Sequence, residues 1–443
     1  MKDKVQGMKQ YQILTILFFC VLIPHLMSKN ITSFDSRWTV PTALSIIREG
    51  NADLDEYKDL LEKHQYYCIE RINGHSYSRF PVGVSVLAVP FVYLVDKTLS
   101  GFPGLERSIR RGIKVYYGYD LEKVDVLTLY PGIELFIASW IVAITACLIY
   151  LIGKQWLDWK GSLLLCFIFA FCTSAWSTAS RGLWQHGPSM FFLSMALYSL
   201  LRAEEKPWSG LLTGLSLALA FGVRPTNSIS VVLFTLLVFF RYRPLFLHYM
   251  LGALAIAIPF LAYNFFVYHS FFSPYYLLLP KIGLHLRIES LIGPLVSPSR
   301  GLFIYSPVWV FSLWGMVLRI SNKEARAIDY CLMGILLLHW LTIASFPDWG
   351  GGHSFGPRYF TDVVPYLTYF LIPVLSYLRR AEGLVKRVGF FLLCLCMAVS
   401  LFVHYRCANS REVFDWNGSP VDVTSHSERY WDWGDIQFLR GIQ

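Results

Sequence analysis

Five short polar clusters interrupt a strongly apolar sequence, and each lies at the end of a hydrophobic run. They are residues 34–38, 183–188, 223–227, 297–301 and 348–359. If the hydrophobic runs cross a membrane in order, all five clusters can lie at the same face. Carboxylates, histidines and arginines gathered at one membrane face predict an active site for a charged substrate that the membrane holds.

The first cluster places Asp35 almost directly after the first hydrophobic run. A carboxylate at the membrane surface is costly unless water or a cation compensates its charge. Two interpretations fit: a solvated loop acid paired with Arg37, or a general base that takes a proton from an acceptor hydroxyl. Asp53 and Asp55 are secondary candidates for the base, and ordinary loop acids also explain them.

Three arginines stand beside Pro or Gly at predicted helix ends, namely Arg224, Arg300 and Arg358. An arginine next to an irregular turn can clamp a phosphate with two parallel hydrogen bonds, or it can pair with a carboxylate. Together with His186 and His353, the three arginines would form a positively charged substrate-binding site at one membrane face. For each arginine taken singly, an ion pair fits as well as a ligand contact.

The second and fifth clusters add aromatic residues and glycines. Trp184 could offer a stacking face to a sugar ring, although interfacial tryptophans are common in any case. His186 precedes Pro188 at a helix start, where a structural hydrogen bond and a contact with a phosphate or sugar hydroxyl both fit. Asp348 is an obvious partner for one of the arginines. The Gly-rich stretch 349–359 lacks the Lys-Ser/Thr ending and the preceding strand of a P-loop, so we exclude nucleotide binding.

The overall composition predicts an all-α polytopic membrane protein. The chain has 443 residues, of which 55% are hydrophobic and only 16% are charged, and its mean hydropathy is +0.45. A soluble protein of this length carries more charge. The net charge is +9, and Lys and Arg cluster in short connectors between apolar runs. Such connectors orient a membrane protein, so we exclude a nucleic-acid partner.

The hydrophobic runs predict a bundle of about eleven transmembrane helices. The predicted spans are residues 11–28, 126–152, 161–180, 188–201, 209–223, 228–240, 247–268, 301–318, 328–346, 361–378 and 388–405. The first run follows several lysines, as a signal peptide would, but no small-residue cleavage site follows it. We therefore expect the first run to be a retained span.

A further apolar run, residues 81–99, is also long enough to span, and the charge pattern decides against it. With 81–99 at the outer surface, the later basic connectors lie on the cytoplasmic side with the N terminus, as the positive-inside rule requires. If 81–99 crossed the membrane, these connectors would face outward. They carry Lys154, Lys160, Arg202, Lys206, Arg241, Arg243, Arg319, Lys323, Arg326, Arg379, Arg380, Lys386 and Arg387. We therefore expect 81–99 to be an interfacial or re-entrant helix.

This threading gives a transmembrane domain over residues 1–405 and a short extracytoplasmic tail over 406–443. The first extracytoplasmic loop, 29–125, would contain the interfacial helix and a basic cluster, in a loop long enough for the positive-inside rule to be weak. The nine cysteines show no metal-ligand spacing. Cys68 and Cys407 fall in predicted outer loops, where a disulfide between them is an open option.

The order of these motifs resembles the GT-C superfamily of polytopic glycosyltransferases. That layout has one span, a long outer loop with an early aspartate, and many helices with arginine and histidine at their outer ends. The chain is most similar to the bacterial branch near the protein O-mannosyltransferases and the lipid A aminoarabinose transferases. The stretches that carry the resemblance are 74–83, 183–188, 223–227, 297–306, 349–359, 416–420 and 430–433.

The resemblance implies an inverting transfer of a sugar from a polyprenyl-phosphate donor to a cell-envelope acceptor. The acceptor would be a lipid-linked glycan, a polysaccharide or a lipid, at the extracytoplasmic face of a bacterial inner membrane. The resemblance also implies that Asp35 is the base and that Arg358 binds the donor phosphate, with Arg300 and Arg224 as further candidates. No cofactor besides the lipid-linked donor is indicated, and a divalent metal stays an open option.

Two other functions are compatible with the same location. An O-antigen ligase or polymerase would share the basic outer face, but its large outer loop usually comes later in the chain. A non-enzymatic transporter or flippase of lipid-linked glycans would place charges near the bilayer midplane. In this sequence the charges lie at the ends of the predicted helices, which favours the transferase.

Overall fold

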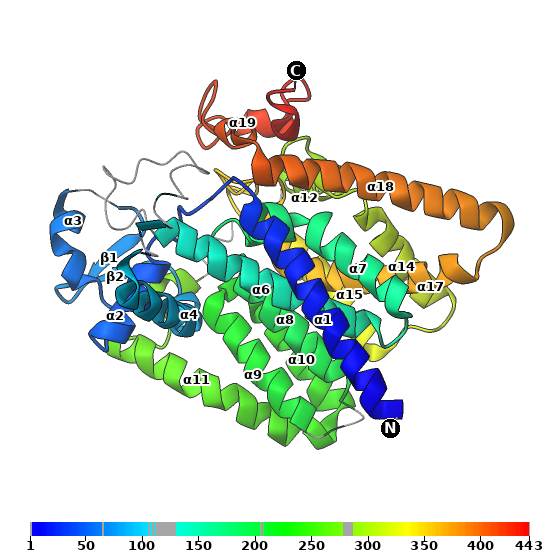
Figure 1. The fold of residues 1–443 in the computed structure, drawn as a ribbon, viewed down its shortest axis with the longest axis horizontal. Coiled ribbons are helices and arrows are strands. Elements are labelled where there is room, and N and C mark those ends of the chain that lie inside the picture. Colours follow the sequence, from blue (N-terminus) through cyan, green and yellow to red (C-terminus); the bar gives the residue numbers. More distant parts are fainter. Residues whose placement is uncertain are drawn as a thin grey trace.

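The computed structural model describes residues 2–63, 66–104, 107–108, 111, 130–203, 206, 208–277 and 287–442. Within these residues the protein is mostly helical (Figure 1), and its one sheet is the antiparallel pair β1 (Ile69–Ile72) and β2 (His75–Ser78). The predicted all-α class is therefore confirmed.

Each of the eleven predicted spans coincides with helical structure. The corresponding helices are α1 (Lys2–Met27), α6 (Tyr130–Gly153), α7 (Trp159–Phe171), α8 (His186–Leu201), α9 (Trp208–Val223), α10 (Ser228–Arg241), α11 (Phe246–Tyr268), α13 (Leu302–Tyr305) with α14 (Trp309–Ser321), α15 (Ala327–Ala344), α16 (Val364–Tyr369) with α17 (Leu371–Arg380), and α18 (Gly383–Asn409). The third predicted span, 161–180, ends its α-helix early and continues as the short helical turn η3 (Ala175–Ala179).

Seven of the described helical segments are long and apolar enough to cross a membrane. Six of them are predicted spans, and the seventh is α4 (Val82–Gly101). The protein is therefore a multi-pass membrane protein. The count of eleven spans stays a prediction, because several of the remaining apolar helices have only 10–17 residues.

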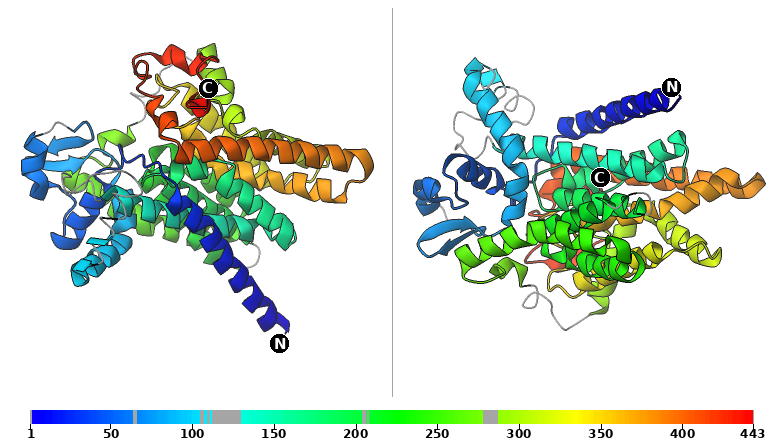
Figure 2. Two further views of the ribbon diagram at one scale, coloured as in Figure 1. Left: turned by 45° about the horizontal axis from the view of Figure 1, so that its top comes forward. Right: turned by 90° about the horizontal axis from the view of Figure 1, so that it is seen from below.

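Helix α4 runs across the ends of the long helices rather than alongside them. Its axis points toward the viewer in Figure 1, where α6, α11 and α18 lie in the plane of the page, and Figure 2 shows it upright beside a horizontal bundle. It packs against α2 (Thr39–Arg48) and α9. This orientation supports the predicted interfacial position. That position stays a prediction, because the length and hydropathy of α4 would also allow it to span.

The loop predicted to be the first outer loop folds into a small cap on one end of the bundle. After α2 come η1 (Asp55–Tyr57), α3 (Lys58–Lys63) and the β1–β2 hairpin, in which Ile69 pairs with Ser78. In Figure 1 these elements lie opposite the N terminus and the α17–α18 connection. Residues 112–129, which would complete the predicted loop and hold part of its basic cluster, lie outside the described residues.

Close helix packing positions the outer end of α9. A Cβ atom at Gly214 would lie 1.9 Å from the Tyr249 carbonyl oxygen, and one at Gly252 would lie 2.0 Å from the Leu211 carbonyl oxygen. Only glycine allows α9 and α11 to approach this closely, as small residues do at membrane helix interfaces. The contact therefore fixes α9, and Arg224 follows directly at its C-terminal end.

The C-terminal tail forms α19 (Arg411–Asp415), η8 (Ser427–Trp431) and η9 (Gln437–Leu439), at the top of Figure 1. The prediction that Cys407 lies in a loop is wrong, because this residue belongs to α18. Cys68 and Cys407 are both buried and free, so no disulfide joins them.

The predicted orientation can be tested with cysteine substitutions at two exposed acids, Glu428 in η8 and Glu324 between α14 and α15. In intact cells, a membrane-impermeant maleimide should label Glu428→Cys, because the tail is predicted to lie outside. It should label Glu324→Cys only after the membrane is opened. The native exposed cysteines, Cys20 and Cys394, are replaced by serine in both variants. The reverse labelling pattern would show that the threading is inverted.

Candidate functional site

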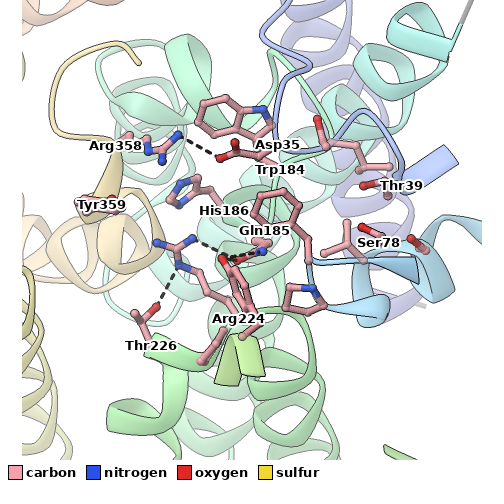
Figure 3. Close-up of a pocket in the computed structure, with 18 of the residues that line it drawn as sticks. Asp35, Thr39, Ser78, Trp184, Gln185, His186, Arg224, Thr226, Arg358 and Tyr359 are labelled. Carbon is pink, nitrogen blue, oxygen red and sulfur yellow. Dashed lines mark hydrogen bonds and ion pairs between the residues drawn. The ribbon is translucent and has the colours of Figure 1, made fainter. Parts of the chain in front are cut away.

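A cavity of about 440 Å³ lies among the first loop, the start of α4 and the outer ends of several helices (Figure 3). Segments that are distant in the sequence build its wall. The lining residues are Asp35, Ser36, Thr39, Ser78, Phe80, Pro81, Val84, Ser85, Leu183, Trp184, Gln185, His186, Arg224, Pro225, Thr226, Tyr275, Phe346, Pro347, Asp348, Arg358 and Tyr359.

A carboxylate and a guanidinium, those of Asp35 and Arg358, face each other at this cavity. Arg358 Nη1 lies 3.4 Å from Asp35 Oδ2, and the Tyr67 hydroxyl donates to Asp35 Oδ1 at 2.7 Å. The distance to Arg358 exceeds the 2.7–2.9 Å that is usual for a charged N–H···O⁻ hydrogen bond. Partial desolvation and then the charge of Asp35 raise the pKa of Tyr67, so its phenol stays protonated and donates. Asp35 Oδ2 is therefore the oxygen better placed to accept a substrate proton.

The guanidinium of Arg358 has room for a further partner. Its central carbon stacks 4.7 Å from the centre of the Trp184 ring, which fixes the plane of the fork. Its Nε is buried and donates to no acceptor among the described residues. A buried N–H group without an acceptor is rare, and a bound anion would supply one.

A second arginine at the cavity, Arg224, is already neutralised. Its Nε lies 2.5 Å from Asp362 Oδ2, and His186 Nδ1 lies 2.9 Å from Asp362 Oδ1. Arg224 also donates to Thr226 Oγ1 at 3.0 Å and to Gln185 Oε1 at 3.4 Å. Asp362 is fully buried in η7 (Arg358–Val363), one turn after Arg358. Asp362 thus holds the outer ends of α8 and α9 together.

Removing Asp362 should destabilise the fold strongly. Asp362→Ala would leave the buried Arg224 guanidinium without its counter-ion, and breaking such a buried pair costs about 3–5 kcal/mol. Asp362→Asn keeps an oxygen acceptor and should cost less. Thermal and denaturant unfolding in detergent measure both effects. An Asp362→Ala protein as stable as the wild type would refute the assigned role.

Hydroxyl groups line the wall near the first loop. The side chains of Thr39, Ser78 and Ser85 face the cavity, and none of the three hydroxyls makes a hydrogen bond within the described part of the chain. Figure 3 shows Thr39 and Ser78 across the cavity from Arg358. Uncharged donors and acceptors of this kind suit the hydroxyl groups of a sugar ring.

The structure brings six of the predicted site residues together. They are Asp35, Trp184, His186, Arg224, Asp348 and Arg358. Asp348 is not the partner of Arg358, because Asp348 Oδ1 instead accepts from Gly351 N at 3.1 Å and from the Tyr430 hydroxyl at 3.3 Å. It shapes the glycine-rich turn beside the cavity.

Arg300 does not line the cavity, and its predicted phosphate contact is not supported. All five of its N–H groups are used within the chain. They donate to the carbonyls of Ser299, Gly350 and Gly352 and to the side chains of Asn417 and Gln437. Its guanidinium also stacks on Trp416 and Tyr430. Arg300 therefore attaches the tail to the glycine-rich turn.

The other predicted residues lie outside the cavity wall. The guanidinium of Arg37 stacks 5.4 Å from the centre of the Tyr66 ring. His353 Nε2 lies 2.8 Å from Asp422 Oδ2 on an exposed surface. These contacts explain both residues without a substrate.

Asp53 and Asp55 form a separate cluster with His75, in which one possible ligand atom of each residue lies within 4.8 Å of the others. His75 Nδ1 is 2.6 Å from Asp55 Oδ2, and this hydrogen bond raises the pKa of His75. Desolvation opposes ionisation of Asp55, but hydrogen bonds from Ser76 N and His75 outweigh it and lower the pKa of Asp55. These three side chains could hold a cation, and they take no part in the cavity.

Sequence reasoning missed Tyr67, Asp362 and Glu134. Tyr67 carries no signal, because a tyrosine in a polar loop is ordinary. Asp362 and Glu134 each stand in a segment that is apolar enough to span, Arg358–Arg380 and Pro131–Gly153. An ionisable residue inside such a segment points to a functional or structural partner, and that signal could have found both.

The fold matches solved structures, although neither sequence comparison finds a match. No family model matches the chain, and neither does any curated protein sequence. The Archaeoglobus fulgidus oligosaccharyltransferase in its apo form has 10% identity and a TM-score of 0.50, with 97% of this chain and 60% of that chain covered. The archaeal oligosaccharyltransferase AglB from the same organism, in complex with an inhibitory peptide and a dolichol-phosphate, has 10% identity and a TM-score of 0.53. That match covers 98% of this chain and 61% of the other.

These comparisons concern the fold alone, because the identity is only 10%. The chain spans about 60% of the length of the structures that it matches. The similarity covers nearly all of this chain, so it includes the helices around the cavity. Over nearly its whole length, the protein therefore shares its fold with these archaeal oligosaccharyltransferases.

Proposed function

We propose that the protein is a GT-C glycosyltransferase that uses a polyprenyl-phosphate sugar as donor. It transfers the sugar to a lipid-linked glycan, a polysaccharide or a lipid at the extracytoplasmic face of a bacterial inner membrane. One observation carries this proposal: Asp35 and Arg358 face each other at the cavity, and Arg358 Nε is buried without an acceptor among the described residues.

Each part of the donor has a counterpart in the cavity. The phosphate binds Arg358, because Arg224 is already paired with Asp362. The sugar ring lies against the hydroxyl groups of Thr39 and Ser78. No nucleotide sugar is expected outside the cytoplasm, so a lipid must carry the donor. The matched AglB structure holds a dolichol-phosphate, which is a carrier of the same chemical class.

The reaction is a single displacement. Asp35 Oδ2 accepts the proton of the acceptor hydroxyl, whose oxygen forms a bond to the anomeric carbon. The bond between that carbon and the phosphate oxygen breaks, and its electrons leave with the polyprenyl phosphate. The anomeric carbon gains oxocarbenium character on the way. Attack from the face opposite the phosphate inverts the anomeric configuration.

Arg358 stabilises the leaving group in this step. The donor phosphate carries one negative charge and the departing phosphate gains a second, so a fixed guanidinium binds the transition state more strongly than the substrate. A phosphate bound to Arg358 competes with Asp35 for the guanidinium, so the ion pair with Asp35 weakens. The Asp35 carboxylate is then free to accept the proton.

A transfer assay tests the proposal. The purified protein is incubated with undecaprenyl-phosphate sugars that carry different radiolabelled hexoses, pentoses and aminosugars, together with isolated cell-envelope acceptors. Transfer of label and release of undecaprenyl phosphate should both require Asp35, whereas Asp55→Asn, a change in the same loop but outside the cavity, should leave both unchanged. Transport of intact donor across a proteoliposome membrane without its cleavage would instead establish a flippase.

A further inference from the structure

A buried glutamate, Glu134, joins the segment that carries Asp35 to the segment that carries Trp184, whose ring stacks on Arg358. Glu134 lies in the second turn of α6 and has no exposed surface. It does not line the cavity and touches none of the reacting groups. Glu134 therefore has no role in the proposed reaction. A buried acid in an apolar helix nevertheless costs free energy and usually has a function.

Among the described residues, Glu134 has three hydrogen-bond partners, and all of them flank the site. Oε1 accepts a hydrogen bond from Ser33 Oγ at 2.5 Å, and Oε2 accepts from Ser36 Oγ at 2.5 Å and from Leu183 N at 3.1 Å. Ser33 and Ser36 bracket Asp35, and Leu183 precedes Trp184. The Glu134 carboxylate thus holds two segments in place: the one that contains Asp35 and the one that contains Trp184, whose indole stacks on Arg358.

The two segments are also bonded to each other. Thr32 N donates to Arg181 O at 2.8 Å, and Trp184 Nε1 donates to Thr32 O. These bonds lie on one side of Asp35, and on the other side Glu134 is the side-chain partner of Ser36 among the described residues. Removing the Glu134 carboxylate would therefore loosen the chain on both sides of Asp35, which Tyr67 and Arg358 would still contact.

A carboxylate suits this position better than an amide or a hydroxyl. It accepts through both oxygens and never donates, so it can satisfy two hydroxyl donors and one backbone N–H at once. A glutamine offers one accepting oxygen, and its NH₂ group would face a serine hydroxyl. Removing one partner from a buried hydrogen-bonded group leaves the others unsatisfied.

We propose that Glu134 is a positioning residue that sets the distance between Asp35 and the Arg358–Trp184 pair. This inference rests on the proposed function, in which Asp35 is the base. Glu134 acts through Ser33, Ser36 and Leu183 and does not contact substrate. Its loss displaces the base from the acceptor hydroxyl, while the donor phosphate can still bind Arg358.

The experiment compares Glu134→Ala and Glu134→Gln with a matched control, Asp329→Asn. Asp329 is equally buried and also accepts a backbone and a hydroxyl hydrogen bond, from Arg326 N at 2.6 Å and the Tyr369 hydroxyl at 2.7 Å, but it lies at the start of α15, away from the cavity. For each variant, kcat and KM for the undecaprenyl-phosphate sugar are measured well below the melting temperature.

Glu134→Ala should lower kcat by about 100-fold, the effect of a displacement of roughly 1 Å at a reacting group, and should leave KM for the donor nearly unchanged. Glu134→Gln should recover part of kcat, because its amide oxygen still accepts one hydrogen bond. Asp329→Asn should lower the melting temperature and leave kcat unchanged. Equal losses of kcat in Glu134→Ala and Asp329→Asn would reduce Glu134 to a structural role and overturn the inference.

Hydrogen exchange gives a readout that does not need turnover. In Glu134→Ala, peptides covering residues 31–37 and 182–186 should both exchange faster, whereas in Asp329→Asn they should not. Unchanged exchange in both segments would overturn the inference even if activity falls. If Asp35→Asn is inactive and Glu134→Ala has normal kcat, the positioning role fails and the proposed function stands. If Asp35→Asn is fully active, the proposed function itself fails.

Discussion

Asp35→Asn should abolish transfer while the protein stays folded. The amide cannot take the proton of the acceptor hydroxyl, and a positioned general base contributes about 10²- to 10⁴-fold to a rate. The amide oxygen can still accept from the Tyr67 hydroxyl, which lies 2.7 Å from Asp35 Oδ1. The first loop should therefore keep its place. Initial rates of sugar transfer, measured at saturating donor, test this expectation.

A measurement of donor binding shows whether Asp35→Asn has lost only its base or its whole binding site. Undecaprenyl phosphate should bind Asp35→Asn at least as well as the wild type, because the variant frees Arg358 from a competing anion. Asp55→Asn, which changes an acid outside the cavity, should behave as the wild type. Normal turnover in Asp35→Asn would end the assignment of Asp35 as base.

Arg358→Lys should weaken donor use by about 1–3 kcal/mol, the range for hydrogen bonds to charged groups. Lysine keeps the charge but loses the planar fork that can bind a phosphate through two parallel bonds. It also loses much of the stacking on Trp184, whose ring centre lies 4.7 Å from the guanidinium carbon. Arg358→Ala should lose more than Arg358→Lys. The measurement is kcat/KM for the donor.

Arg224→Lys is the matched control, since Arg224 lines the same cavity but is paired with Asp362 at 2.5 Å. Its substitution should lower the melting temperature more than it raises KM for the donor. If Arg358 serves only as an ion-pair partner of Asp35, its variants should follow the same pattern as the control. Donor kinetics and melting curves on the same preparations distinguish the two cases.

The helical fold was predictable because the length of each apolar run can be read directly from consecutive residues in the sequence. Each apolar run of sufficient length became a helix, and only the breaks within the runs were missed. The break at Thr173 and Ser174, where α7 ends before η3, is an example. Both polar side chains are buried; Thr173 makes local hydrogen bonds, whereas Ser174 accepts one from the distant Thr361. The orientation of α4 depends on packing against α2 and α9, which no local pattern contains.

The site was only partly predictable, because partner choice depends on three-dimensional neighbours. Asp35 and Arg358 are 323 residues apart, and the shared membrane face was the one clue that joined them. The same clue included Arg300, which stands beside a similar Gly/Pro turn. Backbone carbonyls near that turn and two tail side chains, Asn417 and Gln437, accept from all five of its N–H groups. Sequence context could not tell these two arginines apart.

A structure of Asp35→Asn with an intact undecaprenyl-phosphate sugar tests the central claim most directly, because this variant should bind the donor and not consume it. We expect the phosphate to lie within hydrogen-bond distance of Arg358 and the anomeric carbon to face residue 35. We also expect the sugar ring to lie against Thr39 and Ser78. A phosphate bound at Arg224 alone, or a donor seated outside the cavity, would contradict the account.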